Sequence, residues 1–289
     1  MSQNPSRNEG TEGAAQTAAA HAQVAALDRT GEDTLELFRE NDRYSAFLWE
    51  RLLELSPRPL EGRVLEVGCG IGNLTRILLR SPRVSLLEAI DLDPAYVRRV
   101  AEEVRDPRLR VIAVRAEDFR PSLPGGGRGA FDFVVSTNVL EHIEDDGRAL
   151  SNFRRLLRPG GLALVLVPAH PFLYSALDRN LSHFRRYRKA QLRARAREAG
   201  FEVARLRHFN PLGALGWWLN GKVLRRKSLP PGQLSLYTRF AIPLSSFLDR
   251  WNPFPLGVSL LAVLEAVDAP VPGGCAPEGT GLGPPSRIT

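Results

Sequence analysis

Three glycines occupy alternate positions in the segment VLEVGCGIGNLT, residues 64–75, directly after an apolar run. Glycine loses more conformational freedom on folding than any other residue, so Gly68, Gly70 and Gly72 need a structural reason. The pattern predicts a tight strand-to-helix turn, a close approach of the backbone to a ligand, or both. Glu66 stands two residues before the turn. The segment therefore predicts a site where backbone groups and a carboxylate meet a small ligand.

The spacing of these glycines does not fit the dinucleotide-binding fingerprint Gly-x-Gly-x-x-Gly. Counting from Gly68 puts Asn73 at the third place, and counting from Gly70 puts Thr75 there. The acid beside the turn would also repel a pyrophosphate. The sequence therefore argues against a nicotinamide-dependent oxidoreductase.

Strand-like and helix-like segments alternate along the chain around this turn. Apolar, β-rich runs predict strands at residues 63–69, 84–91, 110–116, 131–137, 162–168, 201–209 and 257–267. Helical spacing predicts helices at residues 32–55, 73–80, 94–104, 145–157 and 188–200. Asp93 beside Pro94 predicts a helix N-cap.

Strands that alternate with helices of this length favour crossover connections, and hence a doubly wound, mainly parallel α/β sheet of seven strands. The 289 residues suit one such domain, which we expect over residues 31–268. A helical, aromatic insertion at 211–255 precedes the last strand. Residues 1–30 and 269–289 lack a core pattern and predict disordered tails.

Four segments at the ends of four consecutive predicted strands carry a family resemblance: VLEVGCGIGNLT, AIDLDP, RAEDF and FDFVVSTNVLEHI. Together they resemble the class I, Rossmann-like S-adenosylmethionine-dependent methyltransferases, whose sheet has seven strands with the last one antiparallel. The similarity spans about residues 40–210 and is to the subgroup that modifies quinones, natural products and other small acceptors. It implies S-adenosylmethionine as cofactor, S-adenosylhomocysteine as product and methyl transfer as the activity.

The resemblance implies a cofactor site at the carboxyl edge of the sheet. Glu66 is expected to meet the methionine ammonium through the turn, and Asp91 to accept both ribose hydroxyls. Leu92 would flank the adenine, whose edge would meet the Ala116 amide and Glu117. The other expected cofactor-binding residues are Gly68, Cys69, Gly70, Gly72, Asn138 and Tyr44.

Four of these assignments have alternatives that the sequence leaves open. Glu66 and Asp91 could be plain surface acids, and Asp118 could replace Glu117 at the adenine edge. Tyr44 could cap the cofactor or belong to an aromatic core with Trp49.

The acceptor is expected at residues 169–188, AHPFLYSALDRNLSHFRRYR, which connect the fifth strand to the next helix. A connection of this length is usually functional or disordered, and its aromatic and charged residues argue against disorder. It resembles a subset of the family with His-x-Arg-Arg-Tyr before that helix. The residues expected to face the acceptor are His170, Tyr174, His183 and Tyr187. Alternatively, an ion pair of Asp178 with Arg185 or Arg186 holds the loop in place.

His142, next to Glu141 just after the fourth strand, is the expected catalytic residue if the acceptor must lose a proton, because histidine titrates near neutrality. Otherwise in-line positioning supplies the catalysis and His142 is structural.

The insertion at 211–255 combines basic residues with Trp217, Trp218, Tyr237, Phe240, Phe247 and Trp251. This mixture suits a lid over an apolar acceptor, a homodimer contact, a peripheral membrane contact, or simple core packing.

The net charge of +7 invites a nucleic-acid partner, but the motifs do not support one. The run TNVLEH lacks the Asn/Asp-Pro-Pro-aromatic pattern of adenine-N6 enzymes, and Cys69 and Cys275 are misplaced for a pyrimidine-C5 nucleophile. An RNA or protein methyltransferase, and an inactive cofactor-binding partner subunit, stay as alternatives to a small-molecule methyltransferase.

Only Cys69 and Cys275 are cysteines, which favours a reducing, cytoplasmic setting without a disulfide framework. No apolar run reaches the length of a membrane span. No acidic cluster of metal-binding spacing follows the fourth and fifth strands, so the sequence predicts no metal.

Overall fold

The computed structural model describes residues 35–36, 39, 42–121, 128–226, 237, 244–245, 248 and 256–267. The predicted tails at 1–30 and 269–289 lie outside these residues, as do Phe240, Phe247, Trp251 and Cys275 of the sequence analysis. Among the described residues, no helix is long and apolar enough to span a bilayer.

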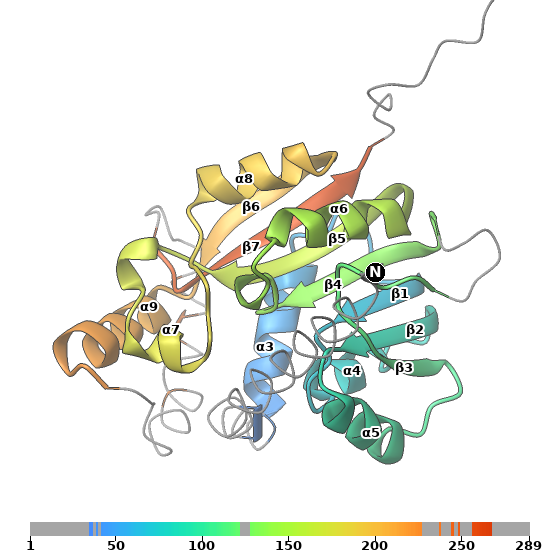
Figure 1. The fold of residues 1–289 in the computed structure, drawn as a ribbon, viewed down its shortest axis with the longest axis horizontal. Coiled ribbons are helices and arrows are strands. Elements are labelled where there is room, and N and C mark those ends of the chain that lie inside the picture. Colours follow the sequence, from blue (N-terminus) through green and yellow to red (C-terminus); the bar gives the residue numbers. More distant parts are fainter. Residues whose placement is uncertain are drawn as a thin grey trace, which may run out of the picture.

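Seven strands form one sheet in the order β3-β2-β1-β4-β5-β7-β6 (Figure 1). β7 is antiparallel to β5 and β6, and the remaining neighbours are parallel. This confirms the predicted fold class. The strands are β1 (Gly62–Val67), β2 (Val84–Asp91), β3 (Leu109–Ala113), β4 (Phe131–Thr137), β5 (Leu157–Pro168), β6 (Phe201–Phe209) and β7 (Ser259–Ala266).

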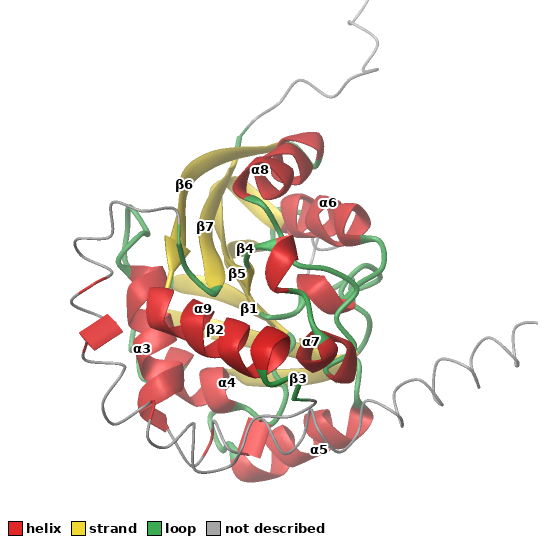
Figure 2. Cartoon of the chain, turned by 90° about the vertical axis from the view of Figure 1, so that its left-hand side faces the viewer, coloured by secondary structure: helices red, strands yellow, loops and turns green. Residues whose placement is uncertain are grey.

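Helices cover both faces of this sheet (Figures 1 and 2). α6 (Asp146–Leu156) and α8 (Lys189–Glu198) pack on one face. α3 (Asp42–Leu53), α4 (Asn73–Leu78) and α5 (Pro94–Glu103) pack on the other. Because both faces are covered, the central strands are apolar runs rather than alternating ones.

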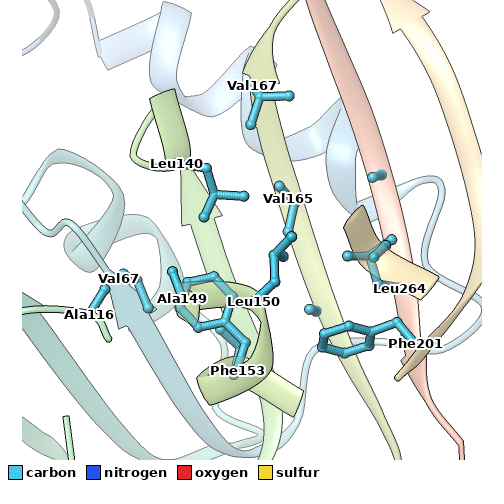
Figure 3. Close-up of a cluster of buried hydrophobic side chains, with 14 of the residues drawn as sticks. Val67, Ala116, Leu140, Ala149, Leu150, Phe153, Val165, Val167, Phe201 and Leu264 are labelled. Carbon is cyan, nitrogen blue, oxygen red and sulfur yellow. The ribbon is translucent and has the colours of Figure 1, made fainter. Parts of the chain in front are cut away.

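The larger core lies between the sheet and α6 with α8. Figure 3 shows Leu150 and Phe153 of α6 beside Val165 of β5, and all three are fully buried. Val67, at the end of β1, belongs to the same cluster. The carboxyl end of β1 is therefore anchored in a well-packed hydrophobic core.

β1 occupies the position where the strand order reverses, between β2 on one side and β4 on the other. In open α/β sheets, ligands bind in the crevice outside the carboxyl ends of the strands at such a point. The glycine turn follows β1 there, so the fold presents the predicted site at the expected place.

β5 begins at Leu157, before the predicted start at residue 162. Leu157 pairs with Phe131, and a bulge separates this pair from the one that joins Phe133 to Leu162. Gly160 has a φ of 70° within this stretch. The Pro-Gly-Gly run, which reads as a break in the sequence, is accommodated as an irregularity inside one strand.

α3 (Asp42–Leu53) lies within the predicted helix 32–55, and the residues described before it, Leu35, Glu36 and Arg39, are also helical. The predicted cap of α5 is confirmed: the Asp93 side chain accepts a hydrogen bond from the Ala95 amide at 2.7 Å, and Pro94 follows the cap.

Replacing Gly68 by alanine should destabilise the protein more than replacing Gly160. Both have a positive φ, 76° and 70°, but a Cβ at Gly68 would clash with the Val139 side chain, whereas none of the described residues comes within 4 Å of one at Gly160. We expect a loss of about 1–2 kcal/mol for Gly160→Ala from backbone strain. Gly68→Ala should lose about 1–3 kcal/mol more from overpacking. Urea unfolding of the two variants measures this, and equal losses would contradict the packing argument.

Candidate functional site

The glycine turn is a left-handed stretch held against β2. Gly68, Gly70 and Gly72 have φ values of 76°, 50° and 83°, which confirms the predicted tight turn. The amides of Gly68 and Cys69 donate to the Ile90 carbonyl at 2.8 and 3.0 Å. These backbone hydrogen bonds fix the turn to β2 without help from a ligand.

The close neighbours of the turn are other parts of the chain. Val139, just after β4, abuts Gly68, and Leu35 lies beside Gly70. The Asn73 side chain donates to the Leu35 carbonyl at 3.0 Å. Sequence reasoning did not single out Leu35, because an isolated leucine in the N-terminal segment has no distinguishing pattern.

Glu66 is 1% exposed and only half satisfied. Its Oε2 accepts a hydrogen bond from the Thr75 hydroxyl at 2.7 Å, while its Oε1 has no partner among the described residues. Burial raises the pKa of Glu66 to about 8. Such a carboxyl is suited to a cationic group that would share its pocket.

Cys69 lies beside Glu66 and is also buried. Burial, together with the charges of Glu66 and Asp91, raises the pKa of the Cys69 thiol. The thiol is therefore protonated and unreactive, and the backbone of Cys69 is what the turn uses.

Asp91 ends β2 directly opposite the turn. Its Oδ2 accepts from the Gly70 amide at 2.8 Å, and its Oδ1 accepts from the Asp93 amide at 3.0 Å. Burial raises the pKa of Asp91, and the two backbone hydrogen bonds partly offset this. Leu92, which follows it, is 48% exposed. The carboxylate is oriented by the backbone and the leucine stands free beside it.

The predicted adenine edge lies after β3. Ala116 is buried, and its carbonyl accepts from the Asn152 side chain of α6 at 2.7 Å. Glu117 is 6% exposed and pairs with Arg115 at 2.7 Å, whereas the more exposed Asp118 pairs with Arg148. Asn152 was missed in the sequence because its position on a helix gives no hint of this distant contact.

Asn138 and Tyr44 lie in different surroundings. Asn138 is exposed just past β4, with a φ of 54° and its amide bonded to the Leu166 carbonyl at 2.9 Å. Tyr44 packs edge-on against Tyr237 with ring centroids 6.3 Å apart, and it hydrogen-bonds Asn210. Burial raises the pKa of Tyr44 to about 12. This favours the aromatic-core interpretation of Tyr44.

A buried ion pair holds the connection at residues 169–188, which we call the acceptor loop. Asp178, in α7 (Ala176–Asn180), is fully buried and binds the Arg186 guanidinium at 2.6 Å. The same carboxylate accepts from the Ser175 amide at 2.9 Å and from the Trp217 indole at 3.1 Å, and it contacts His183 Nδ1 at 3.1 Å. The pairing of Asp178 with Arg186 was one of the two predicted alternatives, while Arg185 instead pairs with Asp146 at 3.2 Å.

Tyr187, predicted to face the acceptor, is instead fully buried in the core. Its hydroxyl donates to Asp146 at 2.8 Å and lies 3.2 Å from the Leu140 carbonyl. The aromatic ring fills the space under α6, so this residue fixes the loop from within.

The other predicted acceptor residues stay near the sheet edge. His170 has a φ of 60° and stacks on His208 with centroids 4.7 Å apart. The Tyr174 hydroxyl donates to the His183 carbonyl at 2.7 Å. Burial lowers the pKa values of His170 and His208, the latter to about 4, so both imidazoles are neutral at neutral pH.

His142 lies in η1 (Leu140–His142), next to His183, with ring centroids 4.8 Å apart. His142 is exposed as a residue, but desolvation of its imidazole and the neighbouring His183 lower its pKa to about 3. A group with this pKa is a weak general base near neutral pH.

A hollow of about 240 Å³ lies elsewhere, between α3, α4 and the loop before β2. It is lined largely by apolar residues such as Trp49, Leu60 and Pro82. It sits at the starting edge of the strands, so it does not belong to the candidate site.

Comparison with known proteins finds a methyltransferase domain over the part of the chain that carries the candidate site. A family model described as a methyltransferase domain matches residues 38–206. An uncharacterized methyltransferase of Mycobacterium tuberculosis is 37% identical over 114 residues, which are 39% of this chain and 54% of the relative. The chain thus spans about half the length of that relative.

Two further matches cover more of both chains. A protein of Mycolicibacterium smegmatis named as a probable S-adenosylmethionine-dependent methyltransferase is 31% identical over 190 residues, 63% of this chain and 68% of the relative. A solved complex from Haloferax volcanii, of a methyltransferase with the Trm112 methyltransferase activator, has a TM-score of 0.57 at 18% identity. It covers 83% of this chain and 99% of that one. At this level of identity, the similarity to the Haloferax volcanii structure shows a shared fold alone.

Replacing Glu66 by glutamine should flatten the pH dependence of stability. Folding raises the pKa of Glu66 to about 8, so its stabilising contribution is present at low pH and is lost as pH rises through about 8. We expect Glu66→Gln to remove about 2–4 kcal/mol of the fall in unfolding free energy between about pH 5 and pH 9. Urea titrations across this range measure it, with the exposed Glu102→Gln as control. A wild-type pH profile in Glu66→Gln would contradict the assignment.

Replacing Asp178 by asparagine should destabilise the chain strongly, because the buried Arg186 loses its charge partner. We expect a loss of about 3–5 kcal/mol. Asp118→Asn, which breaks the exposed pair with Arg148, should lose no more than about 1 kcal/mol. Thermal or urea unfolding of both variants compares them, and similar small losses would show that the buried pair does not hold the loop.

Proposed function

Because this chain belongs to the methyltransferase-domain family, we propose that it transfers a methyl group from S-adenosylmethionine to a small-molecule acceptor. One observation carries the proposal: a half-satisfied buried carboxyl, a left-handed glycine turn and an oriented aspartate converge where the strand order reverses. The neighbouring strand ends carry a loop that is held in place by a buried ion pair.

The cofactor-side residues fit the group that the family implies. The unpartnered Oε1 of Glu66 is an acceptor in need of a donor, and an ammonium group offers three. Asp91 is already oriented by two backbone amides, which suits a carboxylate that must receive a pair of hydroxyls. Leu92 provides an exposed apolar surface for a flat ring. S-adenosylmethionine would supply an electrophilic methyl group on a sulfonium.

The remaining expected contacts extend this site along the sheet edge. Ala116 and Glu117 would meet the adenine, and Asn138 would lie beside the methionine end. The buried position of Glu117, compared with Asp118, supports the choice between the two acids.

The cover over the acceptor loop supports the proposal that the acceptor is a small, enclosed molecule. α9 (Pro211–Trp218) packs on the acceptor loop, since the Trp217 indole donates to Asp178. Lys222 donates to the Tyr174 carbonyl at 2.6 Å, and Gly221 lies against Ser175. His170, Tyr174 and His183 would contact the acceptor under this cover.

Positioning rather than proton abstraction by His142 would then supply most of the catalysis. The chain holds its loops by buried bonds, which favours in-line geometry and the exclusion of water. The low pKa of His142 argues that it orients the acceptor and does not act as a strong base.

The surface of α9 and of the π-helix that follows it, η3 (Leu219–Val223), supports a second contact. Leu215, Trp218 and Leu219 are exposed there, next to the basic residues Lys222 and Arg225. We propose this surface as the place where an apolar acceptor enters, from a membrane surface or across a contact with a second copy.

Calorimetric titration with S-adenosylmethionine and S-adenosylhomocysteine tests the proposal. We expect both to bind the wild type, and Asp91→Asn to weaken binding about 10–100-fold, since it removes a charged acceptor. The control Asp106→Asn alters an aspartate at the opposite edge of the sheet and should bind as the wild type does. Absence of binding to a folded wild-type sample would refute the proposed function.

A further inference from the structure

Glu141, His142 and His183 form a cluster that the proposed cofactor site does not use. Glu141 and His142 belong to η1, and His183 comes from the acceptor loop. One donor atom from each of the three lies within 4.8 Å of the other two. The sequence did not predict a metal because His183 is distant from the other two along the chain.

Backbone hydrogen bonds hold this cluster together. The Phe184 amide donates to the Glu141 carbonyl at 2.8 Å, which joins the acceptor loop to η1 directly. The His183 amide donates to the Asp178 carbonyl at 2.9 Å, after Ser182 with a φ of 57°. The position of the imidazole is thus specified by a turn with a left-handed, non-glycine residue, which costs energy.

Glu141 is a buried carboxyl that receives little hydrogen bonding. It is fully buried, and within the part of the chain that the structure describes, no other residue donates a hydrogen bond to its carboxylate oxygens. Arg186 is nearby, but its Nε is committed to Asp178 and its Nη1 donates to the Ala169 carbonyl at 3.0 Å. A buried polar group in this state is expensive unless a cation or donor accompanies it.

The two histidines are oriented as metal-binding histidines are. His183 Nδ1 lies 3.1 Å from the Asp178 carboxylate, which leaves Nε2 to bind a cation. His142 hydrogen-bonds the backbone of Ser182 through its ring. Ligating histidines usually hold a carboxylate or a carbonyl with the other ring nitrogen in this way.

We propose that Glu141, His142 and His183 bind a divalent transition-metal cation of the zinc class. Two imidazoles and a carboxylate suit Zn²⁺, Co²⁺ or Fe²⁺, whereas Mg²⁺ prefers oxygen ligands alone. In a tetrahedral site with bonds of about 2.0–2.2 Å, the donor atoms lie about 3.3–3.6 Å apart. A rotation of the exposed His142 side chain would close the present spacing of up to 4.8 Å to this value.

Three protein ligands leave an open coordination position, as in catalytic zinc sites. The cluster follows β4, and Val139 of the same segment touches the glycine turn. If the proposed function holds, on which this step rests, the open position receives an oxygen atom of the acceptor next to the methyl donor. This defines the acceptor class as a molecule with a hydroxyl, phenol or carboxylate oxygen at the reacting end.

Metal binding is tested directly on untagged protein that has been stripped with a chelator. We expect Co²⁺ to produce a visible absorption band that saturates at one ion per chain, and Zn²⁺ to displace it. Mg²⁺ should not displace it at a hundredfold higher concentration. Glu141→Gln and His142→Ala should each weaken Co²⁺ and Zn²⁺ binding about 10–100-fold.

The control His208→Ala removes another partly buried histidine at the same edge and should bind Co²⁺ like the wild type. Absence of saturable Co²⁺ or Zn²⁺ binding, or unchanged affinity in both ligand variants, would overturn the site. Calorimetry with S-adenosylmethionine on the same samples separates the two proposals. Cofactor binding without metal binding refutes only the metal site, and metal binding without cofactor binding refutes only the methyltransferase function.

Discussion

The position of β1 between β2 and β4 is the constraint on which the candidate site depends. The crossover from β1 runs through α4 to β2, and the crossover from β4 runs through α6 to β5 in the opposite direction, so a crevice opens between them at the carboxyl end of β1. The chain must turn at this point from a buried strand into α4 without covering the crevice. A left-handed glycine turn satisfies that requirement, and the ends of β2, β4 and β5 then deliver Asp91, η1 and the acceptor loop to the same edge.

The buried carboxyl groups along this edge fall into two kinds, paired and unpaired. Asp178 is fully paired, with hydrogen bonds from several segments, and it organises the acceptor side. Glu66 and Glu141 are buried with unsatisfied oxygens, and burial raises the pKa of each to about 8. The paired carboxylate explains rigidity, whereas the unsatisfied carboxyls are expected where a cationic ligand completes the structure.

Local features of this fold could be predicted from the sequence, because short-range physics determines them. The Asp93 cap, the glycine turn and the bounds of β2, β4 and β6 depend on neighbouring residues alone. The burial of Tyr187, the His170–His208 stack and the Glu141–His142–His183 cluster depend on contacts between distant segments. No periodicity encodes such contacts, and the Pro-Gly-Gly run within β5 shows that even a strong turn pattern yields to strand pairing.

The contact between Val139 and Gly68 joins two halves of the edge that otherwise have separate supports. One half is built from β1 to β3 and the glycine turn. The other is built from the segment after β4, which holds Val139, and from the loop after β5 together with α9. Under the proposed function, substitutions in the second half would change which acceptors bind while the first half stays intact. A substitution of Val139, by contrast, would disturb both halves, because this side chain lies against the glycine turn.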